Sequence, residues 1–318
     1  MPKVDNADLS IVIPVFNNEG SLRDLVTEIL VLFEDSDAVN FEILFVNDGS
    51  NDKSLEVIQD LANSYPDIVY YYNLTRNFGQ LAAMIAGYEH ARGAAIVSIS
   101  ADRQDPTELI LELYKNFLNG HEVVIAHRAA RSDGFFAKFT SRIAYRIARK
   151  SYPALPKGGF DFFLMSSRVN EHLTDFEGRF RFLQGDLMWL GFPTALVPYE
   201  RRARQIGKSG YTLRKRIANF YDLLIDSSPG PIKLVSRLGL FVTVAAVLYG
   251  VTVVIEWGRG RDPFTGWAPL MLVILVMNGT ILLMLGLIGE YLWRLNDAQR
   301  KRPTYVIQQH NRGSLPEK

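Results

Sequence analysis

Two long apolar segments near the C-terminus constrain the fold of this chain more than any other feature. Leu238–Glu256 and Trp267–Leu292 are strongly apolar, and at 1.5 Å per residue each helix would reach about 30 Å, enough to cross a bilayer. Arg259, Arg261 and Asp262 lie in the short connection between them. Basic residues are more frequent on the outer sides of the pair, at Arg214, Lys215, Arg216, Lys233, Arg237, Arg294, Arg300, Lys301 and Arg302. This distribution predicts a membrane hairpin with both termini in the cytoplasm.

The overall composition does not identify a binding partner, so partners have to be inferred from local patterns. The 318 residues are enough for more than one domain. The formal net charge of +1 predicts no partner from bulk charge, so the local distribution of charge has to be considered instead. There is no cysteine, which excludes disulfides and thiolate metal sites. Met1–Asp8 is polar and does not read as a signal peptide, so the region before the first span is expected in the cytoplasm.

Short apolar strands alternate with amphipathic helices before these segments. Strands are predicted at Leu9–Pro14, Phe41–Val46, Ile68–Leu74, in the run before Asp102 and at Val123–Ala126, and helices over Ser21–Phe33, Ser54–Ala62, from Gln80 to about Glu89, and over Glu108–Leu118. This alternation is typical of right-handed βαβ units and a mostly parallel α/β sheet. No Gly-x-Gly-x-x-Gly follows the first strand, which argues against a dinucleotide oxidoreductase.

Acidic side chains follow three of the predicted strands, at Glu19, Asp48 and Asp102. Each also has a simpler interpretation as turn or cap chemistry. Because open α/β sheets bind ligands at the carboxyl ends of their strands, the convergence of all three indicates a nucleotide site.

The segment around Asp102 carries the most specific chemistry. Asp102 and Gln104 supply hard oxygen ligands, which suit Mg²⁺ or Mn²⁺ holding a diphosphate. The alternative is a helix cap, in which Asp105 caps a helix that has Pro106 at its first position. The two interpretations are compatible, because Asp105 can cap while Asp102 and Gln104 bind a metal.

Four motifs occur in order along the chain: Ile13-Pro14-Val15-Phe16-Asn17-Asn18-Glu19, Val46-Asn47-Asp48-Gly49-Ser50, Arg76-Asn77-Phe78-Gly79 and Ala101-Asp102-Arg103-Gln104-Asp105-Pro106. They resemble the motifs of inverting GT-A glycosyltransferases. More narrowly, the chain resembles the polyprenyl-phosphate glycosyltransferases, the group of dolichyl-phosphate mannose synthase and the bacterial GtrB and ArnC enzymes, and the GtrB-type glucosyltransferases most of all. The resemblance runs over nearly the whole chain, including the two apolar segments.

This resemblance assigns the donor site. It implies that Pro14, Phe16 and Glu19 contact uridine and that Asp48 contacts the edge of the base. It also implies that the aspartate-rich motif holds the metal and the donor diphosphate, through Asp102 and Gln104.

The aspartate-rich motif departs from the family pattern at one position. Ser100 replaces the first acid of the usual Asp-x-Asp, and a hydroxyl is a weaker ligand than a carboxylate. Since Mg²⁺ can be held by one or two carboxylates together with substrate phosphate and water, we retain the predicted metal site.

The acceptor site is expected beside a basic amphipathic helix over Phe135–Lys150. Such a helix is usually a solvated face, but it can also lie on anionic lipid. The resemblance implies that Arg128 and Arg142 bind the lipid phosphate, a task that suits the planar fork of arginine. It also implies that Asp161, in Gly158-Gly159-Phe160-Asp161-Phe162, faces the acceptor.

A basic loop matches a further family motif, Arg-x-x-Gly-x-Ser-x-Tyr, at Arg204, Gly207, Ser209 and Tyr211. The amides of such a loop, with arginine and hydroxyl donors, can cradle a diphosphate. The resemblance therefore implies that Arg204 and Ser209 stabilise the leaving diphosphate. A nucleic-acid-binding loop is the alternative, but no larger basic surface accompanies it.

Arg179–Phe192 resembles the block that shapes the sugar pocket. Trp189 within it is interpreted as a core residue rather than a sugar platform. Processive polysaccharide synthases carry Gln-x-x-Arg-Trp near this point, whereas Gln184 and Trp189 lie at a different spacing, which disfavours a processive polymerase.

The predicted organisation is a cytoplasmic GT-A domain over residues 1–210, an amphipathic juxtamembrane helix over 211–231, a transmembrane hairpin over 232–294, and a cytoplasmic tail over 295–318. The tail contains a short β segment that would pair with another subunit or with the catalytic domain.

The resemblance implies transfer of a hexose, with glucose as the best guess, from a UDP-sugar to polyprenyl (undecaprenyl) phosphate at the cytoplasmic face of the inner membrane. It also implies a homo-oligomer, since family members can be tetramers. Two alternatives stay open. One is a transferase with another donor or another lipid acceptor, such as diacylglycerol. The other is a non-catalytic nucleotide-binding membrane scaffold.

Overall fold

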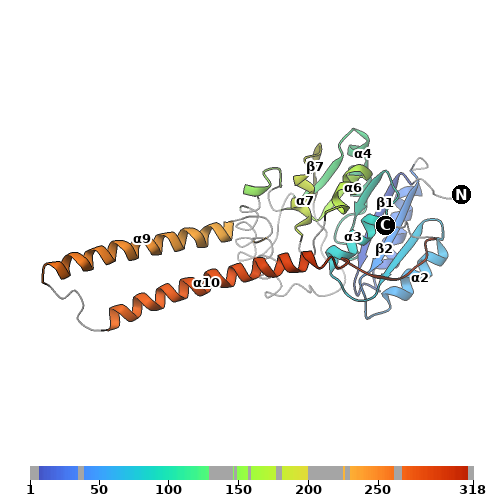
Figure 1. Ribbon diagram of the computed structural model, residues 1–318. Coiled ribbons are helices and arrows are strands. Elements are labelled where there is room, and N and C mark those ends of the chain that lie inside the picture. Colours follow the sequence, from blue (N-terminus) through green and yellow to red (C-terminus); the bar gives the residue numbers. More distant parts are fainter. Residues whose placement is uncertain are drawn as a thin grey trace. The chain divides into compact units, whose positions relative to one another are not determined.

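The computed structural model forms two compact units (Figure 1). The first comprises Met1–Ala218 together with Pro303–Lys318, and the second comprises Asn219–Arg302. The structure describes residues 7–34, 39–128, 146, 149–156, 159–176, 181–199, 225, 230–260 and 267–313.

The first unit is built on an eight-stranded sheet with the order β7-β5-β6-β4-β1-β2-β3-β8. The strands are β1 (Leu9–Val15), β2 (Phe41–Asn47), β3 (Val69–Leu74), β4 (Ala95–Ser98), β5 (Val123–Arg128), β6 (Phe162–Ser166), β7 (Thr194–Tyr199) and β8 (Ile307–His310). Strands β1 to β4 are mutually parallel, and β5 is parallel to β7. β6 is antiparallel to β4 and β5, and β8 is antiparallel to β3. The predicted α/β class with a mostly parallel sheet is therefore confirmed.

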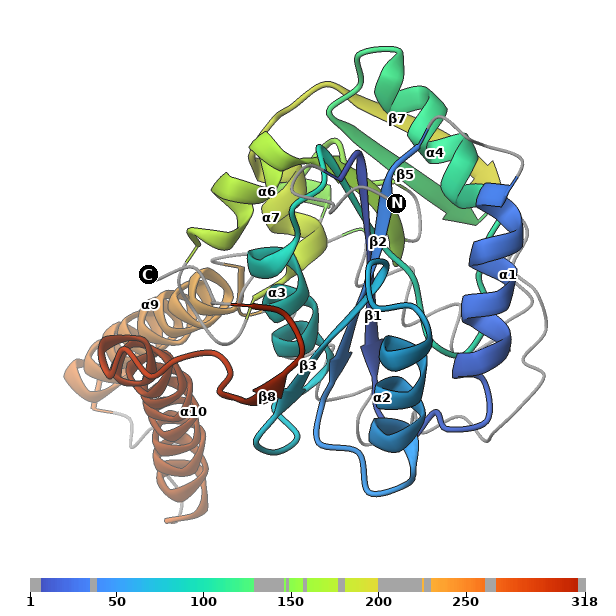
Figure 2. The same cartoon turned by 90° about the vertical axis from the view of Figure 1, so that its right-hand side faces the viewer.

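Helices cover both faces of this sheet. α1 (Leu22–Glu34), α2 (Ser54–Ser64) and α4 (Leu109–Leu118) lie on one face, while α3 (Gln80–His90) and α6 (Ser167–Thr174) lie on the other (Figure 2). α7 (Leu183–Trp189) follows α6 in the chain. Because both faces are covered, the central strands β1 and β2 are mostly apolar, with Ser10, Glu42 and Asn47 as their buried polar residues. α3 approaches β1 closely at Gly87, where a Cβ atom would lie 2.2 Å from Cγ1 of Val12.

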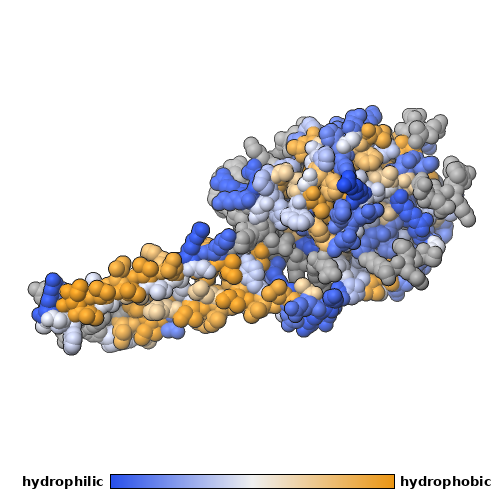
Figure 3. Space-filling model, turned by 45° about the horizontal axis from the view of Figure 1, so that its top comes forward, coloured by the Kyte–Doolittle hydropathy of each residue, from blue (hydrophilic) through white to orange (hydrophobic). Residues whose placement is uncertain are grey.

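The second unit contains a helical hairpin of α9 (Gly230–Gly258) and α10 (Ala268–Gln299). Gly230–Gly258 and Val273–Gln299 have mean hydropathies of 2.4 and 2.0, and both are long and apolar enough to cross a membrane. Apolar side chains cover much of their outer surface (Figure 3). The helices extend beyond the predicted segments at both ends of α9 and at the C-terminal end of α10.

The chain returns to the first unit after the hairpin and adds β8 to the edge of the sheet. Tyr72 on β3 pairs with His310 on β8. Beyond β8, the side chain of Asn311 continues the pairing, because its Oδ1 accepts from the amide of Tyr71 at 2.7 Å and its Nδ2 donates to the carbonyl of Val69 at 3.1 Å. Of the two partners expected for the tail, the structure shows the sheet of the same chain.

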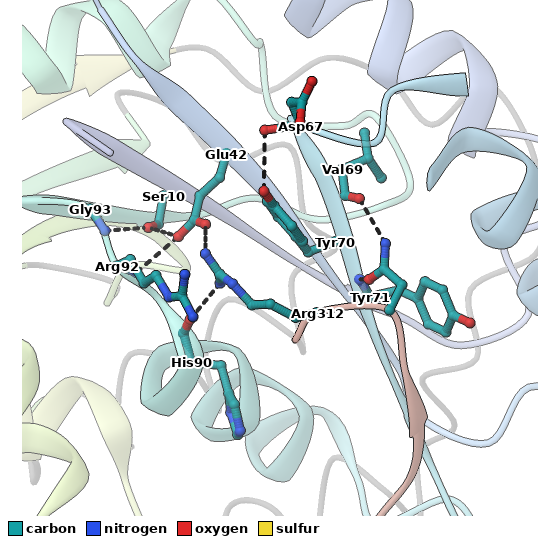
Figure 4. Close-up of polar contacts among 11 residues, drawn as sticks. Ser10, Glu42, Asp67, Val69, Tyr70, Tyr71, His90, Arg92, Gly93 and Arg312 are labelled. Atoms are coloured by element: carbon teal, nitrogen blue, oxygen red, sulfur yellow. Dashed lines mark hydrogen bonds and ion pairs between the residues drawn. The ribbon is translucent and has the colours of Figure 1, made fainter. Parts of the chain in front are cut away.

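A buried ion pair fixes the end of this tail (Figure 4). The Nη2 atom of Arg312 donates to Oε2 of Glu42 on β2, and its Nη1 atom donates to the carbonyl of His90 at 2.9 Å. Oε1 of Glu42 accepts from the hydroxyl of Ser10 at 2.6 Å and from the amide of Arg92 at 2.9 Å. The side chains of Arg312 and Glu42 are only 5% and 0% exposed. The buried carboxylate is therefore surrounded by donors at the amino edge of the sheet.

Candidate active site

The loops that follow β1 and β2 hold each other at the carboxyl edge of the sheet. The amide of Lys53 donates to Oε2 of Glu19 at 2.8 Å, and the amide of Glu19 donates to Oδ2 of Asp52 at 3.1 Å. The amide of Asn51 donates to Oδ1 of Asn17 at 2.8 Å. Glu19 therefore has a structural role beside the uridine contact predicted for it, which stays a prediction.

Burial and main-chain contacts define Asp48. Its Oδ1 accepts from the amide of Phe78 at 2.6 Å, and its Oδ2 accepts from the amide of Gly79 at 2.9 Å. Burial raises the pKa of Asp48, and these two amides act in the opposite direction. Gly49 brings the loops into contact, since its φ is +64° and a Cβ atom there would lie 2.5 Å from the carbonyl carbon of Arg76. Asp48 thus anchors the third loop, and its contact with a base stays a prediction.

The first loop also carries the two remaining residues predicted to contact uridine. Pro14 lies near the end of β1 and is half-buried. Phe16 is the residue after β1, and it is 44% exposed. An exposed aromatic ring beside these polar loops offers a surface on which a flat base can stack.

Asp102 and Gln104 lie on the loop after β4, at the same edge. The main-chain amide of Gln104 donates to Oδ1 of Asp102 at 3.2 Å, so the carboxylate of Asp102 caps a tight turn that contains both predicted metal ligands. Within the described residues, no group of three or more His, Cys, Asp or Glu side chains is placed to hold a metal. One carboxylate and one amide oxygen nevertheless fit Mg²⁺ or Mn²⁺ when the substrate phosphates and water supply the remaining ligands.

The predicted cap at Asp105 is wrong. α4 begins at Leu109 with Glu108 as its N-cap, so Pro106 is not the first helical residue. Asp105 is buried, and its Oδ1 accepts from the hydroxyl of Tyr199 at the end of β7 at 2.9 Å. A buried carboxylate needs a strong donor, and the tyrosine hydroxyl provides one.

Asp161 lies at the same edge because β6 is antiparallel to its neighbours. It immediately precedes β6, whose Phe163 pairs with Ser98 at the end of β4. The Nε2 atom of Gln184 lies 3.5 Å from Oδ1 of Asp161 and also donates to the carbonyl of Phe160. The topology therefore brings Asp161 to the strand next to the one that precedes Asp102.

The structure describes only one of the four residues predicted to bind the acceptor phosphate and the donor diphosphate. The main chain of Arg128 ends β5 and pairs with Tyr199 of β7, at the same edge as Asp161. Arg142, Arg204 and Ser209 lie outside the described residues. The phosphate contacts of all four residues stay predictions.

The interpretation of Trp189 as a core residue is wrong. Trp189 is 69% exposed, and its ring packs edge-on against Phe176 at a centroid distance of 5.5 Å. Tyr152, Phe176, Asp186 and Trp189 line a pocket of about 290 Å³. α7 is short, and it buries Leu187 and Met188 instead.

Two residues near the site were missed in the sequence. Arg103 forms ion pairs with Asp24 and Glu28 on α1, and Gln184 contacts Asp161. The four-residue spacing of Asp24 and Glu28 is a signal for one acidic helix face. No comparable signal identifies Gln184, because its partner Asp161 immediately precedes a strand that the sequence did not predict.

Comparisons with known proteins add family assignments to this geometry. Residues 10–181 match Glycosyl transferase family 2, and residues 230–295 match the GtrB C-terminal hairpin. The uncharacterized glycosyltransferase YkcC of Bacillus subtilis is 36% identical over 301 residues, which cover 94% of this chain and 93% of that protein. The SfII prophage-derived bactoprenol glucosyl transferase of Shigella flexneri is 34% identical over 308 residues, which cover 96% of this chain and 99% of that protein.

Solved structures share the fold at lower identity. Glucosyl-3-phosphoglycerate synthase from Mycobacterium tuberculosis, in complex with phosphoglyceric acid, has a TM-score of 0.50 and 18% identity, covering 70% of this chain and 82% of that chain. Mannosyl-3-phosphoglycerate synthase from Rubrobacter xylanophilus has a TM-score of 0.50 and 19% identity, covering 69% of this chain and 72% of that chain. At these identities the likeness concerns the sheet domain and its fold alone.

Proposed function

Because the chain belongs to glycosyl transferase family 2 and carries a GtrB-type hairpin, we propose that it transfers one glucose from UDP-glucose to the phosphate of a polyprenyl phosphate. The observation that carries this proposal is the similarity to a bactoprenol glucosyl transferase over 96% of the chain. That similarity includes the apolar hairpin as well as the catalytic unit. A hairpin in the membrane keeps a catalytic unit near a lipid acceptor, while the donor arrives from water.

The loops at the carboxyl edge of the sheet would bind the donor. Pro14, Phe16 and Glu19 would contact uridine, and Asp48 would contact the edge of the base. Asp102 and Gln104 would hold Mg²⁺ or Mn²⁺ together with the diphosphate. When bound, this metal would neutralise negative charge on the diphosphate.

The acceptor needs little activation by a general base. The second pKa of a phosphate monoester is about 6, so the acceptor is largely dianionic at neutral pH. Its oxygen attacks the anomeric carbon while the bond to UDP breaks, and catalysis rests on position and on charge stabilisation. Arg128 and Arg142 would hold the acceptor phosphate, and Arg204 and Ser209 the leaving diphosphate. Asp161, beside Gln184, would orient the acceptor or the sugar.

The basic residues outside the hairpin support a catalytic unit and termini in the cytoplasm. The sequence has no cysteine, so a single introduced cysteine reports its own side of the membrane. A cysteine at Gly260 should react with an impermeant maleimide in intact cells, whereas one at Gly313 should react only after lysis. The reverse pattern would contradict this topology.

The chain is also expected to form a homo-oligomer, with the tetramer as first expectation. The mass of the solubilised protein measures the number of subunits.

The function is tested by transfer of labelled sugar with the full chain in detergent or lipid. The donors are UDP-glucose, UDP-galactose, GDP-mannose and UDP-aminoarabinose, and the acceptors are undecaprenyl phosphate and diacylglycerol. We expect transfer from UDP-glucose to undecaprenyl phosphate. Transfer to diacylglycerol alone would assign another acceptor, and UDP binding without turnover would favour a scaffold.

Asp102 provides the sharpest variant for the same assay. We expect Asp102→Ala to lower the rate at least about 100-fold, or about 2.7 kcal/mol of transition-state stabilisation. The variant removes a ligand of the proposed metal, and the negative charge that develops on the leaving diphosphate would then be less well stabilised. Asp60→Ala is the matched control, since this acid on α2 is 62% exposed and pairs with Arg23. Full activity of Asp102→Ala would remove the metal from the proposal.

A further inference from the structure

Arg103 separates the two predicted metal ligands and has a left-handed backbone. Its φ is +56°, a conformation that residues with a side chain rarely adopt. With this backbone, the amide of Gln104 donates to Oδ1 of Asp102 at 3.2 Å. The orientation of the Asp102 carboxylate relative to the main chain of Gln104 therefore depends on the conformation of Arg103.

The side chain of Arg103 ties this turn to α1. Its Nη1 atom donates to Oδ2 of Asp24 at 2.6 Å, and its Nη2 atom donates to Oε1 of Glu28. Asp24 and Glu28 are one helical turn apart, so the planar guanidinium bridges two carboxylates of the same helix face. Only 18% of the Arg103 side chain is exposed. A contact of this kind holds its partners more firmly than a single exposed ion pair does.

The same helix also holds the residue on the other side of Asp102. The hydroxyl of Ser21, just before the first residue of α1, donates to the carbonyl of Ala101 at 2.7 Å. Ser21 and Ala101 are both buried. α1 therefore fixes the main chain before Asp102 through Ser21 and after it through Arg103. A binding group is held accurately when its neighbours are fixed by a rigid element.

We propose that Arg103 is a positioning residue for the bound donor. Through Asp24 and Glu28, it holds the turn in the shape that directs the oxygens of Asp102 and Gln104 to one cation on the diphosphate. This inference rests on the proposed function, because it takes Asp102 and Gln104 as the ligands.

The competing account gives Arg103 a role in stability only. The ion pair between Arg23 on α1 and Asp60 on α2 provides a matched control. Like the ion pairs of Arg103, it involves a residue of α1, but both of its side chains are largely exposed, at 56% and 62%. A variant of Arg23 removes a guanidinium that forms an ion pair at α1, and it leaves the turn at Asp102 unaffected.

The test is a calorimetric titration of the solubilised full chain with UDP, with and without Mn²⁺. Arg103→Leu removes the guanidinium, and the double variant Asp24→Asn/Glu28→Gln removes its partners without changing the turn itself. We expect both to lower the affinity for UDP about 10-fold in Mn²⁺, or about 1.4 kcal/mol, and to leave the affinity without Mn²⁺ unchanged. Arg103→Lys, which keeps the charge but lacks the fork, should restore part of the affinity. Arg23→Leu should match the wild type.

Any of the following results would overturn the inference. One is an unchanged affinity for UDP in Mn²⁺ in both the Arg103→Leu and the Asp24→Asn/Glu28→Gln proteins. Another is an equal loss in Arg23→Leu, or a loss that thermal unfolding at the titration temperature explains. The last is a wild-type affinity that does not respond to Mn²⁺, since no cation would then need to be positioned. Failure of the proposed function looks different: the wild type would bind UDP with Mn²⁺ but transfer no glucose to polyprenyl phosphate.

Discussion

Glu42 and Asp48 lie at opposite ends of β2, and both are buried, yet their partners differ. Glu42, near the amino end, accepts from the side chains of Ser10 and Arg312 and from one amide. Asp48, just after the carboxyl end, accepts from the two amides of Phe78 and Gly79, in a loop of the candidate site. The first arrangement neutralises a charge inside the fold, whereas the second shapes a loop beside solvent. The partners of a buried acid, rather than its burial, therefore indicate whether it serves stability or a binding site.

The largest effect is expected at the amino end. Arg312→Ala leaves the charge of Glu42 buried without its cation, which should cost about 3–5 kcal/mol and lower the thermal unfolding midpoint by roughly 10 °C. Adding Glu42→Gln removes the unpaired charge, so the double variant should recover roughly 2–3 kcal/mol. The affinity for UDP, measured well below the unfolding midpoint, should not change. Loss of UDP binding by folded Arg312→Ala would break the contrast between the two ends.

A smaller effect on stability is expected at the carboxyl end, together with an effect on binding. Asp48→Asn keeps one acceptor but turns an amide donor toward the main-chain donor of Phe78 or Gly79. We expect a loss of about 1–3 kcal/mol in the free energy of unfolding, and a lower affinity for UDP in the same preparation. Thermal unfolding and UDP titration measure the two quantities side by side. A stability loss without any change in UDP binding would assign Asp48 to the fold alone.

The smallest effect is expected for Asp52, in the loop joined to Glu19. Burial raises the pKa of Asp52, but hydrogen bonds from the hydroxyl and amide of Ser54 and from the amide of Glu19 outweigh it and leave the pKa below 3.8. The unfolded chain therefore binds the proton first as the pH falls, and the contribution of Asp52 to stability is lost as the pH falls through the folded pKa. Asp52→Asn should make the acid-induced loss of stability shallower, by less than about 1 kcal/mol. An unchanged acid profile would contradict this assignment.

Local periodicity predicted the strands and helices from Leu9 to about Arg128, because each is an apolar run or an amphipathic stretch bounded by polar turns. The same reasoning missed β6 (Phe162–Ser166), which is a short apolar run without alternation. Its residues also do not indicate that it pairs antiparallel with both of its neighbours. Local periodicity also missed β7 (Thr194–Tyr199), where Pro198 weakens a strand pattern and fits only the edge position that β7 has in the sheet. Strand direction and sheet position are decided by tertiary pairing rather than by local sequence.

The candidate site was predicted at the level of residue types and not of contacts. Acids and amides after three of the parallel strands, β1, β2 and β4, were enough to bring Glu19, Asp48 and Asp102 to one edge, because parallel strands end together. The ties of Arg103 to Asp24 and Glu28 span 79 and 75 residues of sequence, so no local pattern contains them. Trp189 was misplaced for a related reason, since an apolar side chain on a short helix can face either way.

The return of the chain to the sheet makes the apolar hairpin an insertion within the catalytic unit. Translation proceeds from the N-terminus, so β8 and Arg312 leave the ribosome only after α9 and α10 have been made. Until then β3 is an open edge, and Glu42 lacks its cation. The catalytic sheet is therefore completed only after both apolar helices have been synthesised.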